Sequence, residues 1–504
     1  MKKRTRNIII IGAAALVLII LYFAVINPWV SKVLSEEEDV PELLDGEVLG
    51  SGNRILLFEH TEKADMLSIE VHNQFGSYKF YRGDDDNFYI EGMEMAPYSL
   101  EMLSSLVVST GYTLSMKRLD FEEMEDDFSV YGLGENDNPA WYVVTKMDGR
   151  THKVIVGNMI PTGGGYYCMY EGRKAVYILD TSFTTTVLAD IHTFLTPTLG
   201  WPVSTSSYYF VDDFQIIRNG ELYVWIDNVP AAEDSETGLP TYELKIPEGY
   251  TCNLTTYSAI LEKLTSFAGE SVVAAGVELK DADETYLKNE FGIDLDNPYF
   301  LLHYKVDEID TMVIFSEPDD DGMVYAYSTV YNLVAKMSAS SAEFLKWGLL
   351  EYVDPGLFGK NINDVAKMEI KGSIESEGIT VDEYFTLDGE GETIIIRQNG
   401  ESTAYDADSV KNFRQLYKVF LGIKLQDYVD EGYEKNLKEL CEAKVTMDDG
   451  TVLEYKFWSY STRRCYYTIN GVGEFYCFRD SVEKLIRDTY RMVNGQQIIS
   501  DDKS

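Results

Sequence analysis

The stretch WYVVTKMDGRTHKVIV, residues 141–156, predicts two strands joined by a tight turn at Asp148-Gly149. A second stretch, AKVTMDDGTVLEYKFW at residues 443–458, has the same pattern and turns at Asp449-Gly450. Aspartate and glycine tolerate the positive φ angles that a short hairpin turn needs. A third stretch, YFLLHYKVDEIDTMVIF at residues 299–315, has both strands but a longer turn. These hairpins mark one unit that occurs three times.

The sequence around each hairpin repeats the same order of elements. Hairpin-like strands come first, then a helix, then two hairpins and a closing helix. The first helix is expected at SLEMLSSLVVST (99–110), TTYSAILEKLTSF (255–267) and DSVKNFRQLYKVF (408–420). Apolar residues three or four positions apart give each helix one stripe that a sheet can cover. We therefore expect α+β domains, each an antiparallel sheet of consecutive hairpins with helices packed on one face.

The approach to the hairpin also repeats, but only twice. Asn138-Pro139 and Asn297-Pro298 come just before the strand in the first two copies, where proline suits a strand start because it offers no N–H. The third copy lacks this pair. The copies recur at roughly 150 residues, which is the size of a domain. We predict three tandem repeat domains at residues 56–200, 201–355 and 356–496, followed by a tail at 497–504.

The N-terminal region predicts a membrane anchor. The basic tip MKKRTRN at 1–7 precedes IIIIGAAALVLIILYFAVI at 8–26, which contains no charged residue. At ~1.5 Å per residue, a helix of this length crosses most of a ~30 Å hydrocarbon core. A cleaved signal peptide is the alternative, but its apolar part usually has only about 7–15 residues. We expect a single-pass helix in the cell membrane, with a cytoplasmic N-terminus and the bulk of the chain extracytoplasmic.

Residues 27–55 connect this helix to the first domain. Their centre, SEEEDVPELLDGEVLGSG at 35–52, is acidic, is interrupted by Pro41 and shows little periodicity. Such a composition predicts a solvated stalk.

The whole chain is acidic, with 43 basic and 84 acidic residues and a formal net charge of −41. Phosphate binding needs clustered lysine and arginine, so this balance argues against nucleic acid and anionic lipid headgroups as direct partners. The simplest role of the charge is to keep an exported protein soluble.

Five cysteines in 504 residues are too few for a disulfide framework. Cys465 and Cys477 lie on the two arms of one expected hairpin and could be neighbours across it; whether they pair is left open. Cys168, Cys252 and Cys441 are expected to be buried as small hydrophobic side chains.

No familiar catalytic or metal-binding pattern occurs, and the sequence contains no HExxH, CxxC, P-loop or GxSxG motif. The five histidines lie in separate elements; they are His60, His72, His152, His192 and His303. Residues 84–87 and 319–322 resemble calcium loops in composition only, and the glycines at 132–134 and 163–165 suit turns. We expect no catalytic, cofactor-binding or metal-ligating residues and no cofactor, although a site assembled from distant residues stays open.

Aromatic residues are numerous, with 36 Tyr, 23 Phe and 6 Trp. Tyrosine is a good strand residue, which is the simplest explanation. Exposed Tyr and Trp on a sheet can also stack on sugars or anchor a protein partner.

The expected anchor, the stalk, the repeated units and the motif FEHTEKADMLSIEV (58–71) together resemble a known family. They are similar to bacterial membrane proteins that carry domain of unknown function 4340. The resemblance covers almost the whole chain beyond the anchor, but it transfers no site residues. It implies repeated extracytoplasmic domains and an association with ABC-type transporters of the kind linked to gliding motility.

These observations predict a non-enzymatic extracytoplasmic binding or scaffolding subunit of a membrane complex, accessory to an ABC-type transporter. Its partners would be the membrane, through the N-terminal helix, and proteins of that complex. Two alternatives are an extracytoplasmic hydrolase of envelope polymers that uses paired carboxylates, and a surface protein that binds cell-wall glycan.

Overall fold

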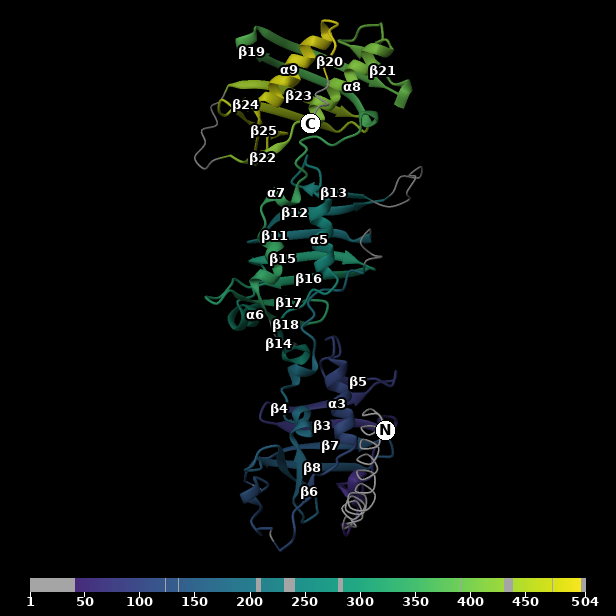
Figure 1. Cartoon of the computed structure of the whole chain (residues 1–504), viewed down its shortest axis with the longest axis vertical. Coiled ribbons are helices and arrows are strands. Elements are labelled where there is room, and N and C mark those ends of the chain that lie inside the picture. Colours follow the sequence, from purple (N-terminus) through teal and green to yellow (C-terminus); the bar gives the residue numbers. More distant parts are fainter. Residues whose placement is uncertain are drawn as a thin grey trace, which may run out of the picture. The chain divides into compact units, whose positions relative to one another are not determined.

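The computed structural model in Figure 1 describes residues 41–122, 124–134, 136–204, 210–230, 241–279, 284–389, 391–429, 438–473 and 475–499. The chain divides into two compact units, Met1–Thr196 and Pro197–Ser504. The first unit contains one eight-stranded sheet and the second contains two.

The N-terminal predictions fall largely outside this description. The basic tip at 1–7, the transmembrane helix at 8–26 and the first part of the stalk, residues 27–40, all lie outside the described residues. Within the described ranges, no helix has the length and apolar character needed to cross a membrane.

The first domain is one antiparallel sheet with two main helices. Its elements are β3 (Met66–Asn73), β4 (Gly76–Arg82), β5 (Phe88–Ile90), α3 (Leu100–Gly111), β6 (Lys117–Arg118), β7 (Ala140–Lys146), β8 (Thr151–Met159), β9 (Gly165–Tyr170), β10 (Tyr177–Asp180) and α4 (Thr181–Val187). Across the sheet the strands lie in the order β5-β4-β3-β7-β8-β9-β10-β6.

The second domain repeats this plan with an additional helix before its central hairpin. Its elements are β11 (Asp212–Arg218), β12 (Glu221–Val229), β13 (Thr241–Ile246), α5 (Leu254–Leu264), β14 (Ser271–Ala275), α6 (Glu284–Phe291), β15 (Phe300–Val306), β16 (Ile309–Phe315), β17 (Met323–Ser328), β18 (Leu333–Ser338) and α7 (Leu349–Tyr352). The order across the sheet is β13-β12-β11-β15-β16-β17-β18-β14.

The third domain follows the plan again and ends in a long helix. Its elements are β19 (Val365–Ile374), β20 (Ile379–Asp388), β21 (Ile395–Gln398), α8 (Ala407–Leu421), β22 (Leu425–Tyr428), β23 (Glu439–Met447), β24 (Val452–Ser459), β25 (Arg464–Ile469), β26 (Phe475–Phe478) and α9 (Arg479–Val493). The order is β21-β20-β19-β23-β24-β25-β26-β22.

All three sheets therefore share one connectivity. The third strand of each domain ends at one edge, a helix follows it, and the short fourth strand pairs with the eighth strand at the opposite edge. The first strand of each domain also breaks register at the same place, between Met66 and Ser68, between Asp212 and Gln215, and between Val365 and Lys367. The prediction of three tandem antiparallel domains is confirmed.

Each long first helix begins where a side chain satisfies a free backbone N–H group. Ser99, Asn253 and Asp406 accept hydrogen bonds from the N–H groups three residues later, at the starts of α3, α5 and α8. Such caps typically contribute about 1 kcal/mol each. The buried faces of these helices then cover the apolar side of the sheet, as expected.

The opposite face of the sheet differs between the domains. In the first domain, Tyr131 and Leu133, from the segment between β6 and β7, pack with Ile155 and Met169. Val154 and Val156 are buried on the helix side, so the intervening Ile155 points to the other face. Part of this second face is therefore covered as well.

In the second domain the same region is covered by helix α6 and its flanks. Leu287 and Ile293 belong to one apolar cluster with Ile314 of β16 and Val334 of β18. Helix α6 thus packs on the face opposite α5, and the prediction that helices occupy one face is wrong for this domain. The reason is the longer connection before the central hairpin, which spans residues 276–299.

The third domain has fewer residues between its fourth and fifth strands, β22 and β23, and its sheet has different side chains on this face. In the third sheet, Lys456 lies opposite Thr468. The equivalent pairs are Ile155 with Met169 in the first sheet and Ile314 with Tyr327 in the second. Polar residues thus occupy the positions that are apolar in the other two sheets.

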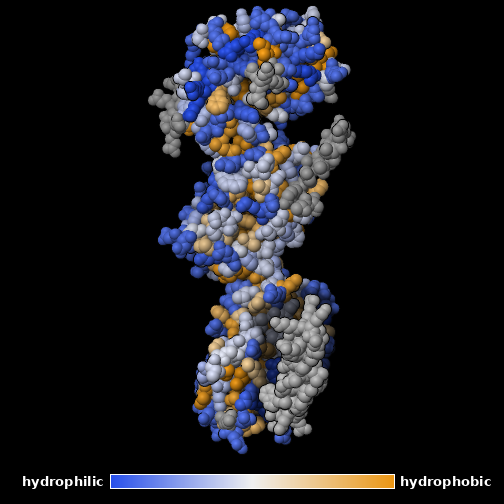
Figure 2. Space-filling model, viewed as in Figure 1, coloured by the Kyte–Doolittle hydropathy of each residue, from blue (hydrophilic) through white to orange (hydrophobic). Residues whose placement is uncertain are grey.

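On the face seen in Figure 2, hydrophilic residues dominate and hydrophobic residues occur as separate patches.

Candidate functional site

We take a cleft in the second unit as the candidate site. It lies beside β13, which is the edge strand of its sheet, and we call it the β13 cleft. Residues within 241–252 and Trp225 line it from the second domain. Residues 358–360, the turn of the β23–β24 hairpin and the first part of β24 line it from the third domain. Its volume is about 640 Å³, within the ~300–1,000 Å³ range of small-molecule sites.

Aromatic side chains form much of the wall of the β13 cleft. They are Trp225, Tyr242, Tyr250, Phe358 and Tyr455. Tyr455 packs against the rings of Phe358 and Phe420, with centroid distances of 6.0 Å and 5.4 Å. These contacts hold its ring in one orientation.

Two polar atoms of this wall are buried without a hydrogen-bond partner among the described residues. They are the hydroxyl of Tyr455 and the indole Nε1 of Trp225. Tyr455 is 0% exposed, and burial raises the pKa of its phenol, which stays protonated at neutral pH. Leaving such a group unsatisfied costs about 1–3 kcal/mol. Both atoms have almost no accessible surface, so they are part of the packed wall and are not open to the cleft.

Both lysines of the cleft lie near carboxylates. Lys245 contacts Glu243 over 2.7 Å, and this bond raises the pKa of the lysine. The pKa of Asp449 is lowered mainly by the backbone N–H of Thr451, which donates over 2.8 Å, with a smaller contribution from the charge of Lys360. Each lysine therefore has an acidic neighbour.

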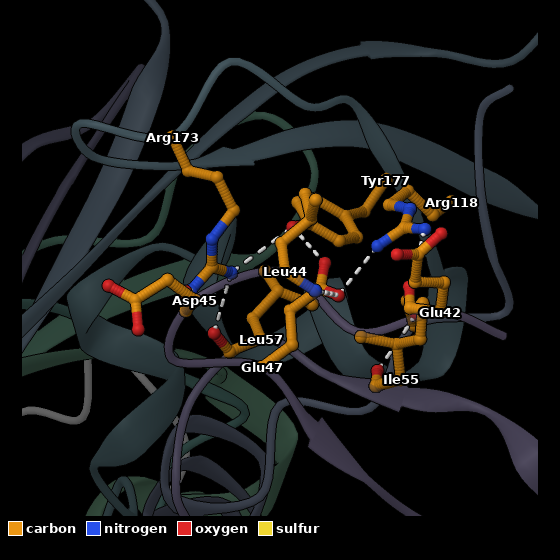
Figure 3. A network of polar contacts seen from close by, with 10 residues as sticks. Glu42, Leu44, Asp45, Glu47, Ile55, Leu57, Arg118, Arg173 and Tyr177 are labelled. Atoms are coloured by element: carbon orange, nitrogen blue, oxygen red, sulfur yellow. Dashed lines mark hydrogen bonds and ion pairs between the residues drawn. The ribbon is translucent and has the colours of Figure 1, made fainter. Parts of the chain in front are cut away.

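A second polar arrangement lies in the first unit, around Glu47 (Figure 3). The Glu47 side chain is 0% exposed, and Oε2 accepts hydrogen bonds from Nη1 of Arg118 at 2.6 Å and from the N–H of Leu44 at 2.7 Å. Tyr177 donates to Oε1 at 2.5 Å. All bonds of this buried carboxylate come from groups that the fold holds in place.

Two arginines extend this network to the main chain of the segment before the sheet. Arg173 donates to the carbonyl oxygens of Leu57 and Asp45, both at 2.8 Å, and Arg118 donates to that of Glu42 at 2.8 Å. Strands β1 (Val48–Leu49) and β2 (Ile55–Leu56) pair within the segment. Residues 41–55 are thus fastened to the domain, which corrects the expectation of a stalk solvated along its whole length.

The histidines singled out in the sequence make separate contacts. His72 bonds Ser77, His152 bonds Tyr170, His192 pairs with Asp190 and His303 pairs with Asp310, whereas His60 packs against the ring of Tyr112. Within the described ranges, no group of three or more His, Cys, Asp or Glu residues is arranged to hold a metal ion.

The acidic runs form turns in the structure. Oδ1 of Asp85 accepts from the N–H of Asn87, and Oδ1 of Asp319 accepts from the N–H groups of Asp321 and Met323. These carboxylates accept hydrogen bonds from backbone N–H groups of their own turns, in agreement with the turns expected from the sequence.

The cysteines are buried free thiols. Cys465 lies directly opposite Cys477 across β25 and β26, as the hairpin pattern suggested. Burial raises the pKa of Cys465 to about 12, which leaves its thiolate form scarce at neutral pH.

Sequence reasoning did not find the β13 cleft or the Glu47 network. Both combine residues far apart in the chain, and the tyrosine-rich strands were the only sequence signal for the cleft. Comparisons with protein-family models, with curated proteins and with solved structures found no match.

Proposed function

We propose that this protein is a non-enzymatic binding and scaffolding subunit of a membrane complex. Residues 8–26 would hold it in the membrane, and its three domains would stand outside the cytoplasm. The β13 cleft, with a volume of about 640 Å³ and aromatic walls, is the observation that carries the binding role.

The Glu47 network supports the scaffolding role. It fastens the chain from residue 42 onward to the first domain. Few residues then separate the proposed membrane helix from a folded domain, which would keep that domain close to the bilayer. A subunit that positions a partner at a membrane benefits from such a short connection.

The proposed partner is an ABC-type transporter. This step rests on the resemblance to membrane proteins that carry domain of unknown function 4340. The acidic composition, with a net charge of −41, agrees with a protein partner better than with nucleic acid.

Purification of the tagged protein from gently solubilised membranes tests this proposal. We expect a permease and an ATPase of the ABC type to co-purify, and an untagged strain should yield neither. Recovery of the protein without either component would contradict the transporter assignment.

A hydrolase of envelope polymers is the second candidate, because the pKa of one carboxyl group is raised, which is the direction that favours a general acid. Burial, together with the nearby charge of Asp227, raises the pKa of Asp212. A hydrolase should release soluble fragments from isolated envelope, and the substitution Asp212→Asn should abolish that release. Unchanged envelope after prolonged incubation would eliminate this candidate.

A further inference from the structure

We propose that the β13 cleft binds an extended, positively charged segment of a partner protein, which pairs with β13 as an additional strand. This inference rests on the binding role proposed above and names the class of partner that the same site takes. It follows from the outer edge of β13, from the way the cleft surrounds that edge and from the charges of the cleft.

Strand β13 is the longest edge strand that the structure describes in the three large sheets. It has six residues, whereas β5, β6, β14, β21 and β22 have three, two, five, four and four. Among the described residues, β13 pairs only with β12. Alternate residues of an edge strand direct their N–H and C=O groups away from the sheet, where an extended chain can bond to them. At about 3.4 Å per residue, β13 offers such a template over about 20 Å.

The cleft surrounds the outer edge of β13. Side chains of a strand alternate between the two faces of a sheet, so a cleft over one face would border every second residue, but this cleft is lined by the consecutive residues 241–245. Tyr242 lies on the face that carries α5, since its ring is 4.8 Å from that of Tyr257. Thr241 and Glu243 therefore point to the opposite face. The cleft reaches both faces, so a peptide inside it would lie beside the backbone of β13.

The third domain stands next to this edge and limits what can enter. Just beyond β13, the ring of Tyr250 is 5.7 Å from that of Phe475, and a Cβ at Gly249 would come within 2.5 Å of Ile469. A second copy of the chain would have to bring a whole sheet into this position. A single extended segment needs only the spacing of one strand, about 4.8 Å.

The charges of the cleft favour a cationic segment. Glu243, Glu248 and Asp449 line it together with Lys245 and Lys360. Glu243 contacts Lys245 over 2.7 Å, so this pair offers no net charge to a ligand. Two carboxylates then remain against one lysine, and the chain as a whole has a net charge of −41. The cleft should therefore attract lysine and arginine side chains and repel acidic ones.

A compact polar ligand such as a saccharide is the closest competitor, because aromatic side chains line much of the cleft. Its hydroxyl groups would need polar partners, but the hydroxyl of Tyr455 and the indole nitrogen of Trp225 have almost no accessible surface. The backbone groups along the outer edge of β13 can bond to an extended chain without help from these side chains.

Calorimetric titration of the full-length protein in detergent tests the inference. One set of synthetic decapeptides has lysine or arginine at every third position and varied uncharged residues elsewhere. A matched set has glutamate or aspartate at those positions, and the tetramer of N-acetylglucosamine is the third probe. We expect the best basic peptide to bind at least about 10-fold more tightly than its acidic counterpart. Failure of all basic peptides at millimolar concentration, or tighter binding of an acidic peptide or of the saccharide, would overturn the inference.

Hydrogen exchange locates the bound peptide. At saturation, the basic peptide should slow the exchange of backbone amides in β13 about 10-fold or more, because its carbonyl groups accept from them. Strand β14, at the opposite edge of the same sheet, is the internal control and should be unchanged. Equal protection of both strands, or none in β13, would contradict strand addition.

N-methylated peptides distinguish backbone pairing from side-chain contacts. Only alternate N–H groups of an added strand point to β13. Methylation of one alternate set should therefore abolish binding, and methylation of the other set should leave it largely intact. Equal binding of both methylated forms would also overturn the inference.

Charge reversal in the cleft tests the preference for basic peptides. Glu248→Lys should weaken the basic peptide about 3- to 10-fold, because it places a positive charge in the cleft. Glu401→Lys is the matched control, since it changes the net charge equally at an exposed residue that does not line the cleft. Equal losses in the two variants would contradict the assignment of the charge preference to the cleft.

The outcomes also separate this inference from the proposed function. Failure of the peptides with a transporter still co-purifying would reject this inference alone. Peptide binding without a transporter would reject only the transporter assignment.

Discussion

The hydroxyl of Tyr177 donates a hydrogen bond to Oε1 of Glu47 over 2.5 Å, although the two residues are 130 positions apart in the chain. Burial and the neighbouring Glu47 raise the pKa of the Tyr177 phenol, which remains a donor at neutral pH. The contact joins the start of the described chain to the eighth strand of the first sheet. It makes the segment at 41–57 part of the domain.

Glu47→Gln should therefore destabilise the first domain. The substitution leaves Arg118, whose side chain is 14% exposed, without its buried charge partner. Breaking such a pair typically costs about 3–5 kcal/mol. We expect a lower melting temperature and faster proteolysis within residues 41–57, measured by calorimetry and limited digestion.

Glu59→Gln is the matched control for Glu47→Gln. The Glu59 side chain is 66% exposed, and its contacts with Lys146 and Arg150 are 3.9 Å and 3.6 Å long. Such surface pairs contribute about 0–1 kcal/mol. Equal effects of the two variants would show that Glu47 does not have the role assigned to it.

Equivalent positions on the second and third sheets, on the faces opposite α5 and α8, should respond oppositely to exchanged residues. Ile314 is 5% exposed beneath α6, so Ile314→Lys would bury a charge and should cost more than about 3 kcal/mol. Lys456→Ile removes only a partly exposed pair with Glu454 and should change stability by less than about 1 kcal/mol. Urea unfolding of both variants measures this difference, and similar costs would contradict the proposed equivalence of the two positions.

Acidification should weaken the first domain through His152. Burial, and then the charges of Lys146 and Arg150, lower the pKa of this imidazole below its usual 6.5. The folded state then binds fewer protons than the unfolded state, so stability is full above pH 6.5 and is lost as pH falls through the folded pKa. The melting temperature should drop from pH 7.5 to 5.5 by less in His152→Gln than in the original protein. An identical drop would rule out His152 as the cause.

The five thiols should be inert in the native protein. All are buried, and burial raises the pKa of Cys252 and of Cys465 to about 12. Iodoacetamide at pH 8 should label them only after unfolding, as mass spectrometry can count. Rapid native labelling, or a disulfide between Cys465 and Cys477 in the unreduced protein, would contradict the structure.

Local patterns were sufficient to predict the repeated framework. The turn expected at Asp148-Gly149 joins β7 to β8, with Thr145 opposite Thr151. The helices expected at 99–110 and 408–420 are found at Leu100–Gly111 and Ala407–Leu421. Hairpin turns and apolar spacing depend on neighbouring residues, which is why the sequence shows them.

The short fourth strands were missed because they form only through distant pairing. Strand β6 has two residues, Lys117 and Arg118, and it exists because β10 lies beside it. The role of Glu47 was missed for the same reason. In the sequence it is one of several acidic residues in a polar stretch, and its partners Arg118 and Tyr177 come from distant strands. The β13 cleft was missed because Trp225 and Tyr455 are far apart in the sequence.

Photo-crosslinking in intact cells tests most directly the claim that the protein binds through the β13 cleft. A benzophenone amino acid would replace Lys245 in the cleft or, as the control, Lys456 on the third sheet, whose side chains are 37% and 30% exposed. We predict that light yields a crosslinked product, visible by mass spectrometry, from position 245 and not from position 456. Equal products from both positions, or none from position 245, would contradict the account.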